Sequence, residues 1–364
     1  MKRVVIATAV ALMCAGVIST AQKPGNPNPG RVHGNPFLQW DDNGEVVHML
    51  PPHGVAHGKD AGDDTAVDDD GEIFAPSTNT FASTTGSAGA TYTASYGSGA
   101  LTDKGGLEIS NAAYFAIYWN SSVSGSTAVS KTTATVYKTL QAELSDFITK
   151  FGADANFTNV ASNNLSIIQQ YGSKSAIAPT LTNLGYFIDT QKTAASITDA
   201  SIRTYLTGLF NAGKVKVSAN TIYGVYFPAG MTVNLMTGYN SCAQFCAYHR
   251  AFTYSTAAGS VQIKYAVMPY TNCTACTISG LQVADTLTIT TGHEIREAIT
   301  NPGDNGLVSW TDLNGYEADD KCAWHNLYQM SNGKFWMQPE YSNGGTKNAA
   351  TGVTYPGPGC IVPK

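Results

Sequence analysis

The cysteines constrain the fold of this chain more than any other feature of its sequence. Six of the seven lie between residues 242 and 360, and the seventh, Cys14, lies in an apolar N-terminal run. An even number of cysteines in an exported chain indicates a disulfide framework, so we expect disulfides to staple this part of the chain. Two close pairs, Cys242-x3-Cys246 and Cys273-x2-Cys276, leave a structural zinc site as the alternative. The six cysteines are Cys242, Cys246, Cys273, Cys276, Cys322 and Cys360.

The N-terminal residues follow the pattern of a secretory signal peptide. Lys2-Arg3 precedes the apolar run VVIATAVALMCAGVI, and the small residues Ser19-Thr20-Ala21 follow it. We expect cleavage after Ala21, which would remove Cys14 with the leader. A membrane anchor is the alternative, but no basic flank follows the apolar run. The sequence therefore predicts a secreted protein, extracellular or periplasmic, and not an integral membrane protein.

Composition and charge narrow the class of protein further. The chain has 364 residues, of which 43% are hydrophobic, and this excludes global disorder. Its formal net charge is −5, and it has no block of lysines or arginines. Because nucleic-acid binders carry a basic patch, we expect no nucleic-acid partner. The sequence leaves the oligomeric state open.

Residues 22–90 differ in composition from the rest of the chain. Three histidines, His48, His53 and His57, precede an acidic run over residues 60–72, and apolar side chains show no regular period. We expect a low-complexity His/Asp-rich segment that is a loop, a linker or a propeptide. These side chains could form a weak divalent-metal or calcium patch, and the alternative is a solvated acidic tail.

Ordered structure is expected from about residue 108, in a globular domain over 91–364. Its pattern predicts an α/β or α+β fold, with a mixed sheet packed against helices in one main disulfide-stapled domain. The expected strands are 112–119, 165–171, 223–227 and 261–267, and the expected helices are 131–151, 198–213 and 280–300.

The last of these helices carries the motif His293-Glu294-Ile295-Arg296-Glu297. On an α-helix His293 and Glu297 lie one turn apart on the same face, as the two histidines of a zinc-binding H-E-x-x-H helix do. Here a carboxylate replaces the second histidine, and it suits zinc as well as harder cations such as calcium. Glu294 is then the candidate general base. The alternative is that these are charges on an exposed helix face.

An acidic loop after the helix could complete a metal site. Asn301-Pro302 ends the helix, and Glu317 and Asp320 follow within a short segment as candidate third ligands. We expect Asp319 to be solvated. His249 is a further candidate, as a ligand or as a donor to a reaction intermediate, and His325 is a weaker one.

Several segments resemble the phosphate-induced, exordium-like family of secreted proteins over roughly residues 91–364. The most specific are Cys246-Ala247-Tyr248-His249 and Cys273-Thr274-Ala275-Cys276. The others are YFAIYW (114–119), QAELSDFITKF (141–151), ITDASIRTYL (197–206), IYGVYFPAGMTV (222–233), AITNP (298–302) and Gly359-Cys360. The H-E-x-x-E helix and the loop matched by Glu317, Asp320 and Cys322 are similar to microbial members, whose helix looks like that of metzincin metallopeptidases. The resemblance implies an exported, wall-associated protein without a settled activity.

Together these features predict a secreted metal-dependent hydrolase, a zinc metallopeptidase-like protein acting on a peptide or cell-wall substrate. His293, Glu297 and one of Glu317 or Asp320 would bind Zn2+ or Ca2+, and Glu294 would act as general base. The rival hypothesis is a non-catalytic extracellular or wall-binding module with a structural metal. An open cleft would favour the enzyme, whereas exposed aromatic rows and a closed metal site would favour the module.

Overall fold

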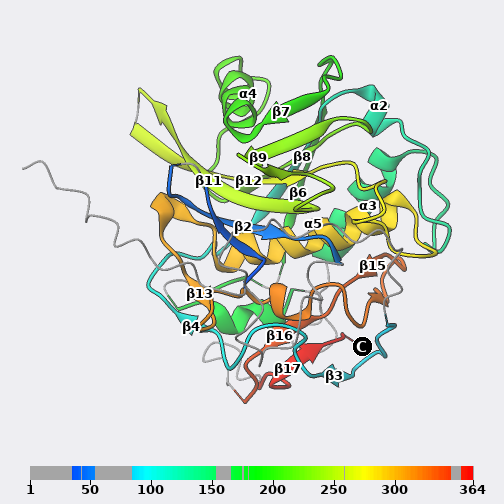
Figure 1. The fold of residues 1–364 in the computed structure, drawn as a ribbon, viewed down its shortest axis with the longest axis vertical. Coiled ribbons are helices and arrows are strands. Elements are labelled where there is room, and N and C mark those ends of the chain that lie inside the picture. Colours follow the sequence, from blue (N-terminus) through cyan, green and yellow to red (C-terminus); the bar gives the residue numbers. More distant parts are fainter. Residues whose placement is uncertain are drawn as a thin grey trace, which may run out of the picture. The chain divides into compact units, whose positions relative to one another are not determined.

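A seven-stranded mixed sheet and one long buried helix organise the part of the chain that the structure describes (Figure 1). The computed structural model describes residues 35–41, 43–53, 84–152, 165–173, 176–178, 180–257, 259–345 and 354–363. All of them belong to one unit, residues 34–364. The expected signal peptide and the acidic run over 60–72 lie outside the described residues.

The central sheet combines parallel and antiparallel pairs. Its strand order is β1-β2-β11-β12-β8-β5-β6, with antiparallel pairs from β1 to β12 and parallel pairs from β12 to β6. This confirms the predicted mixed α/β class. The strands are β1 (Leu38–Trp40), β2 (Val46–Leu50), β5 (Ala113–Tyr118), β6 (Thr182–Ile188), β8 (Thr221–Tyr226), β11 (Ala247–Thr256) and β12 (Gly259–Met268).

The parallel strands of the sheet are apolar because they are covered on both faces. Every residue of β8 is buried, and most of β5 is. Gly224 lies at the tightest point, since a Cβ there would come within 1.6 Å of the Tyr114 hydroxyl oxygen. That hydroxyl is hydrogen-bonded to Tyr226, which in turn contacts Thr291 on the long helix. The strands predicted over 112–119, 223–227 and 261–267 are therefore confirmed.

Four α-helices in the described part of the chain flank the sheet: α2 (Ser121–Ser124), α3 (Leu140–Gly152), α4 (Asp199–Asn211) and α5 (Val283–Thr300). As predicted, α4 begins after Thr198, whose side chain accepts a hydrogen bond from the Ser201 amide. Helix α5 begins with a capping box between Gln282 and Asp285 and ends before Asn301-Pro302.

Helix α5 is enclosed on all sides. It contacts β11, β12 and β8 of the sheet, together with α3 and the strand β15 (Trp336–Met337). Every residue from Ala284 to Thr300 is buried. The alternative of an exposed charged helix face is therefore wrong, and each polar side chain of α5 must find a partner inside the protein.

Short strands and turns complete the fold around α5. Strand order is β10-β9-β7 in one small sheet and β16-β17-β3 in another, and β13 pairs with β4 and β14 with β15. These strands are β3 (Thr91–Tyr92), β4 (Thr102–Asp103), β7 (Ser196–Thr198), β9 (Thr232–Met236), β10 (Tyr239–Asn240), β13 (Trp310–Thr311), β14 (Tyr328–Gln329), β16 (Glu340–Ser342) and β17 (Gly359–Ile361). The 3-10 turns are η2 (Ile167–Tyr171), η3 (Asp304–Gly306) and η4 (Asp320–Cys322).

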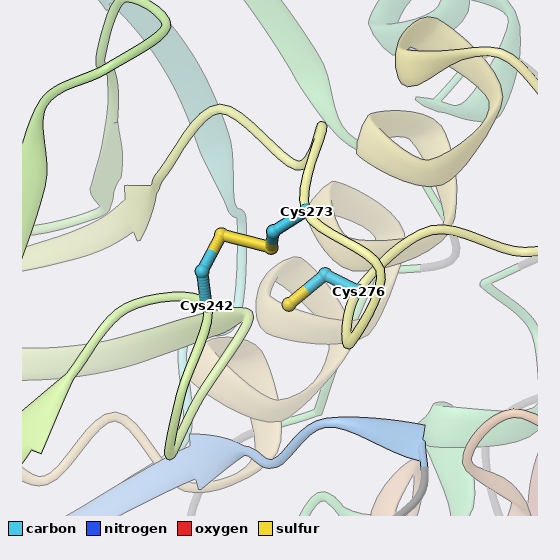
Figure 2. A group of neighbouring side chains, drawn as sticks. All are labelled: Cys242, Cys273 and Cys276. Atoms are coloured by element: carbon cyan, nitrogen blue, oxygen red, sulfur yellow. A yellow bond between two sulfur atoms is a disulfide. The ribbon is translucent and has the colours of Figure 1, made fainter. Parts of the chain in front are cut away.

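Three disulfides confirm the predicted framework. They join Cys242 to Cys273, Cys246 to Cys276, and Cys322 to Cys360. Figure 2 shows Cys242 bonded to Cys273, with Cys276 beside them. Because all six sulfurs are paired, the alternative of a cysteine zinc site is wrong.

Three local predictions are wrong. Residues 38–40 and 46–50 form β1 and β2, although no ordered structure was expected before about residue 108. The helix expected over 131–151 begins only at Leu140, because Val136 is 93% exposed and does not extend the apolar face. The apolar run over 165–171 forms the turn η2 and not a strand. In the described part of the chain, no helix is both long and apolar enough to cross a membrane.

Candidate metal centre

A cluster of buried histidines and carboxylates lies beside α5. No member is more than 7% exposed, and several are completely buried. Helix α5, the strands β2 and β11 and the loop that ends in η4 all contribute to it. We call it the His/carboxylate cluster; its members are His48, His249, His293, Glu294, Glu297, Glu317 and Asp320.

The i, i+4 pair on α5 lies as the sequence predicts. His293 Nε2 is 3.0 Å from Glu297 Oε2, but the two atoms do not have hydrogen-bond geometry, and Nε2 has no hydrogen-bond partner. The Nε2 atom of His293 is therefore close to the Glu297 carboxylate but does not donate a hydrogen bond to it. The other ring nitrogen, Nδ1, lies 3.1 Å from Nε2 of the Gln338 amide, which also donates to the Asp319 carbonyl.

The acidic loop returns to α5 as predicted. The amide of Asp320 donates to Glu297 Oε1 at 2.9 Å, and Asp320 Oδ1 lies 3.7 Å from His293 Nε2. Asp320 Oδ2 accepts a hydrogen bond from the amide of Glu317 at 2.8 Å. The turn η4 therefore holds Asp320 between the helix and Glu317, and the disulfide of Cys322 fixes the end of that turn.

His249 lies between two hydrogen-bond acceptors. Its Nδ1 is 2.9 Å from Glu294 Oε2, and its Nε2 is 3.2 Å from the carbonyl oxygen of Asn301. A carbonyl oxygen and an ionised carboxylate both accept, so beside an ionised Glu294 both ring nitrogens donate and the ring is an imidazolium. Burial alone would lower the pKa of His249, but Glu317 and Glu294 outweigh it and leave that pKa raised. The His249 ring thus connects Glu294 with the Asn301 carbonyl.

His48 enters the cluster from β2. In the antiparallel pair of β2 and β11 it lies directly opposite His249, and the two rings stack 5.9 Å apart. Its Nδ1 is 2.7 Å from Glu317 Oε2, yet the two atoms do not have hydrogen-bond geometry and neither has another hydrogen-bond partner. Its Nε2 faces the Asn301 amide at 3.3 Å, and that amide donates to Glu317 Oε1 at 2.7 Å.

A second buried charge group lies next to the cluster. Arg296 donates to Asp319 Oδ2 from Nε at 2.8 Å, and its NH1 lies 3.7 Å from Glu340. Asp319 is completely buried, so the prediction that it is solvated is wrong. Burial raises the pKa of Asp319 to about 6, although Arg296 opposes the shift. Burial also raises the pKa of Glu340 well above its ordinary value.

Burial and mutual repulsion govern the carboxylates of the cluster. Burial first, and then the charges of its acidic neighbours, raise the pKa of Glu297 and of Asp320 well above ordinary values. Burial alone would also raise the pKa of Glu317, but the charges of His48 and His249 outweigh the effect of burial and lower that pKa. Four carboxylates thus share one enclosed space with few cations.

Three groups of histidine and carboxylate side chains bring potential ligand atoms within 4.8 Å of one another. The first is His293, Glu294 and Glu297, the second is His48, Glu317 and Asp320, and the third consists of His249, Glu297 and Glu317. Imidazole and carboxylate are the donors that divalent cations of the zinc type take in proteins. The first two groups share no residue, and the third uses one carboxylate from each.

All six sequence-predicted site residues therefore meet in one place. His53 does not join them, since its Nε2 lies 3.1 Å from the carbonyl oxygens of Thr274 and Thr277. His325 lies beside Tyr96 instead, and His57 is outside the described residues. The sequence places His48 only in a candidate weak metal patch, because the strand that carries it has no apolar period. Comparison of the chain with family models, with curated proteins and with solved structures finds no match.

One cavity among the described residues is not lined by the cluster. That cavity, of about 430 Å3, is lined by residues that include Arg250, Asp199 and Asp41. Arg250 follows His249 on β11, so its side chain points to the opposite face of the sheet. Its guanidinium is paired with Asp199 and Asp41. The His/carboxylate cluster is therefore an enclosed site.

Proposed function

We propose that this protein is a secreted metal-dependent hydrolase, most similar in its donor set to zinc metallopeptidases. The observation that carries the proposal is the pair His293 and Glu297. Two ligands of one zinc ion, each roughly 2.0–2.2 Å from it, lie about 3 Å apart with their lone pairs converging on the ion. His293 Nε2 and Glu297 Oε2 lie 3.0 Å apart without a hydrogen bond between them. Asp320 Oδ1, 3.7 Å from the same nitrogen, is the third ligand.

The position of Gln338 beside His293 also suits a bound cation. Nε2 ligation requires the proton of His293 on Nδ1, facing Gln338. The Gln338 Oε1 atom is buried without a partner, and turning the amide would let it accept that proton. Gln338 is thus the residue that would set the tautomer of the ligand.

Glu294 is the proposed general base. A bound divalent cation would supply Lewis-acid polarisation of the scissile carbonyl and a lowered pKa for water. Glu294 Oε2 is held by His249, whereas its Oε1 is buried and has no hydrogen-bond partner. Glu294 could therefore accept a proton at Oε1 while His249 keeps the carboxylate in place, so His249 is a positioning residue.

Secretion and family membership are part of the proposal. Disulfides persist in oxidising compartments, and the described part of the chain has three. The motifs from Cys246 to His249 and from Glu317 to Cys322 support a place among the microbial exordium-like proteins. In that family setting α5 would be the metzincin-like helix, and the substrate would be a peptide or a cell-wall component.

A non-catalytic module with a structural metal is the second candidate, and the enclosure of the cluster favours it. A structural site has no open coordination position, and Glu294, Glu317 and His293 are completely buried. The aromatic rows expected for a wall-binding surface are not found among the described residues, where Tyr186 is the one exposed aromatic side chain. Because these aromatic rows are missing from the described residues, we place the hydrolase before the structural module.

One experiment separates the two candidates. The zinc-loaded full chain is incubated with a mixed library of quenched fluorescent peptides, beside Glu294→Gln and the surface control Glu45→Gln. The hydrolase predicts cleavage that falls about 10²–10⁴-fold in Glu294→Gln with the zinc content unchanged. Equal rates for wild type and Glu294→Gln would refute the base. Bound zinc without cleavage by any of the three would establish the structural module.

A further inference from the structure

The second group of ligand atoms has its own unsatisfied pair. In the first group the buried atom without a partner on the histidine is Nε2 of His293. In the second group the corresponding atoms are Nδ1 of His48 and Oε2 of Glu317, which lie 2.7 Å apart without hydrogen-bond geometry. The two side chains lie at ion-pair distance, yet neither of these atoms forms a hydrogen bond, whereas buried polar atoms usually form one.

The two groups have separate histidines and glutamates and share Asp320. The first needs His293 and Glu297, and the second needs His48 and Glu317. Asp320 lies between them, since its Oδ1 faces His293 and its Oδ2 accepts from the Glu317 amide. His249 lies with Glu297 and Glu317 in the third group, but its ring nitrogens face Glu294 and the Asn301 carbonyl.

The charge of the cluster suits divalent cations. Four carboxylates, from Glu294, Glu297, Glu317 and Asp320, lie in it beside three histidine rings, and all seven side chains are buried. Carboxylates that lie between two groups are what bridges metal pairs in hydrolases, where the ions lie roughly 3.5–4 Å apart.

We propose that the His/carboxylate cluster holds two divalent cations, the second one on His48, Glu317 and Asp320, with Asp320 as the bridge. The proposal deepens the proposed function and rests on it for the first cation. Ligation through Nδ1 of His48 places the ring proton on Nε2, so the 3.3 Å contact with the Asn301 amide opens. Asn301 keeps its shorter bond to Glu317.

The strand β2 gives this site a consequence for the whole fold. His48 is the one ligand that comes from outside the segment between β11 and η4. A second cation would therefore join β2 to the acidic loop. Val47, Met49 and Leu50 of the same strand are buried, so β2 is held in place before any ion binds.

The test counts metal ions in the full chain and does not depend on activity. The purified protein is stripped with a chelator, equilibrated with Zn2+ and analysed for zinc per chain, beside His48→Leu, His293→Leu and the control His325→Leu. A parallel titration with Mn2+ follows the electron paramagnetic resonance spectrum of the wild type. Circular dichroism verifies that each variant is folded.

We expect two zinc ions per chain in the wild type and in the control His325→Leu. We expect one zinc ion per chain in His48→Leu and one in His293→Leu. The manganese spectrum of the wild type should show a spin-coupled pair. One zinc ion that is kept in His48→Leu and lost in His293→Leu would overturn the second site and leave the proposed function intact. One ion with the opposite pattern would overturn the first site and the pair. A wild type without zinc and without bound manganese would overturn both proposals, even if a variant failed to fold.

Discussion

The Nδ1 atom of His249 lies 2.9 Å from Oε2 of Glu294, and the Nε2 atom of the same ring lies 3.2 Å from the Asn301 carbonyl oxygen. One imidazole ring thus links the strand β11, the middle of α5 and the residue that follows α5. The carboxylate that it holds is the proposed general base. In that proposal the ring positions Glu294.

Replacing His249 with Gln should impair the reaction and leave the metal in place. Glu294 would lose the cation that fixes it, so we expect kcat to fall about 100-fold with KM and zinc content unchanged. The kcat and KM on a peptide cleaved by the wild type, together with zinc per chain, check this prediction. Loss of zinc from the variant would show that His249 is a ligand and not a positioning residue.

Gln338 should tune the affinity of the cluster for zinc. Replacement by Met removes the group that faces Nδ1 of His293, and outer partners of this kind contribute about 10–100-fold in affinity. Competition with a chromophoric chelator measures the dissociation constant of each protein. Gln329→Met, at an exposed amide that lies on β14, is the matched control. If Gln338→Met bound zinc as tightly as the wild type, His293 would keep the required tautomer without Gln338.

Arg296 should contribute strongly to stability through its buried ion pair. It is 1% exposed, and its NH2 lies 2.6 Å from Asp319 Oδ2. Arg296→Met leaves Asp319 and Glu340 without their cation, so we expect a loss of about 3–5 kcal/mol in the free energy of unfolding. Adding Asp319→Leu should restore part of that loss. Additive effects of the two substitutions in urea denaturation would contradict the pairing.

The disulfide between Cys322 and Cys360 should support both stability and metal binding. Replacing both cysteines with Ala removes the link two residues after Asp320, and we expect a loss of about 2–4 kcal/mol in stability with weaker zinc binding. The matched control replaces Cys242 and Cys273, which are linked far along the chain from Asp320. It should lose a similar stability and keep its zinc affinity. Equal zinc affinity in both double variants would show that the disulfide between Cys322 and Cys360 does not support zinc binding.

Glu143 should make the stability of the protein depend on pH. Burial raises the pKa of this α3 carboxyl to about 7, with the Ser130 amide opposing and Asp285 adding to the shift. A pKa that is higher in the folded state gives a contribution that is fully present below the unfolded value and is lost as the pH rises through about 7. Glu143→Gln removes this titration, so between pH 5 and pH 8 its stability relative to the wild type should rise by about 2 kcal/mol.

Urea denaturation of both proteins at the two pH values measures that difference. The other titratable groups are common to both proteins and cancel, and the same holds for any fixed cost of burying an amide in place of the Glu143 carboxyl. A constant difference between Glu143→Gln and wild type at pH 5 and pH 8 would show that Glu143 is ionised in the folded protein throughout this range.

The chemistry of α5 could be predicted because it is local. The spacing of His293 and Glu297 places them on one face of any helix, and Asn301-Pro302 ends that helix. The position of Asp320 next to α5 could also be predicted, because Asp320 follows the end of the helix within a short loop. Residues 286–291 of this helix are mostly β-branched, a composition that suits burial, and all of them are buried.

The contribution of His48 could not be predicted in the same way. Its position opposite His249 depends on the pairing of β2 with β11, which joins parts of the chain that are distant in sequence. A strand of five residues without strict alternation gives little periodic signal. Asp319 was misjudged for a related reason, because its partner Arg296 is buried by packing that residue type does not reveal.

The pairing of β2 with β11 also determines when the cluster can exist. His48 precedes nearly all of the described chain, whereas Glu317 and Asp320 follow α5. Contacts between such distant segments form late, because the loop between them must close first. A growing chain would therefore have no complete donor set until almost all of it had been synthesised. The metal would be acquired by a nearly finished molecule, at the end of folding, and could not guide the earlier steps.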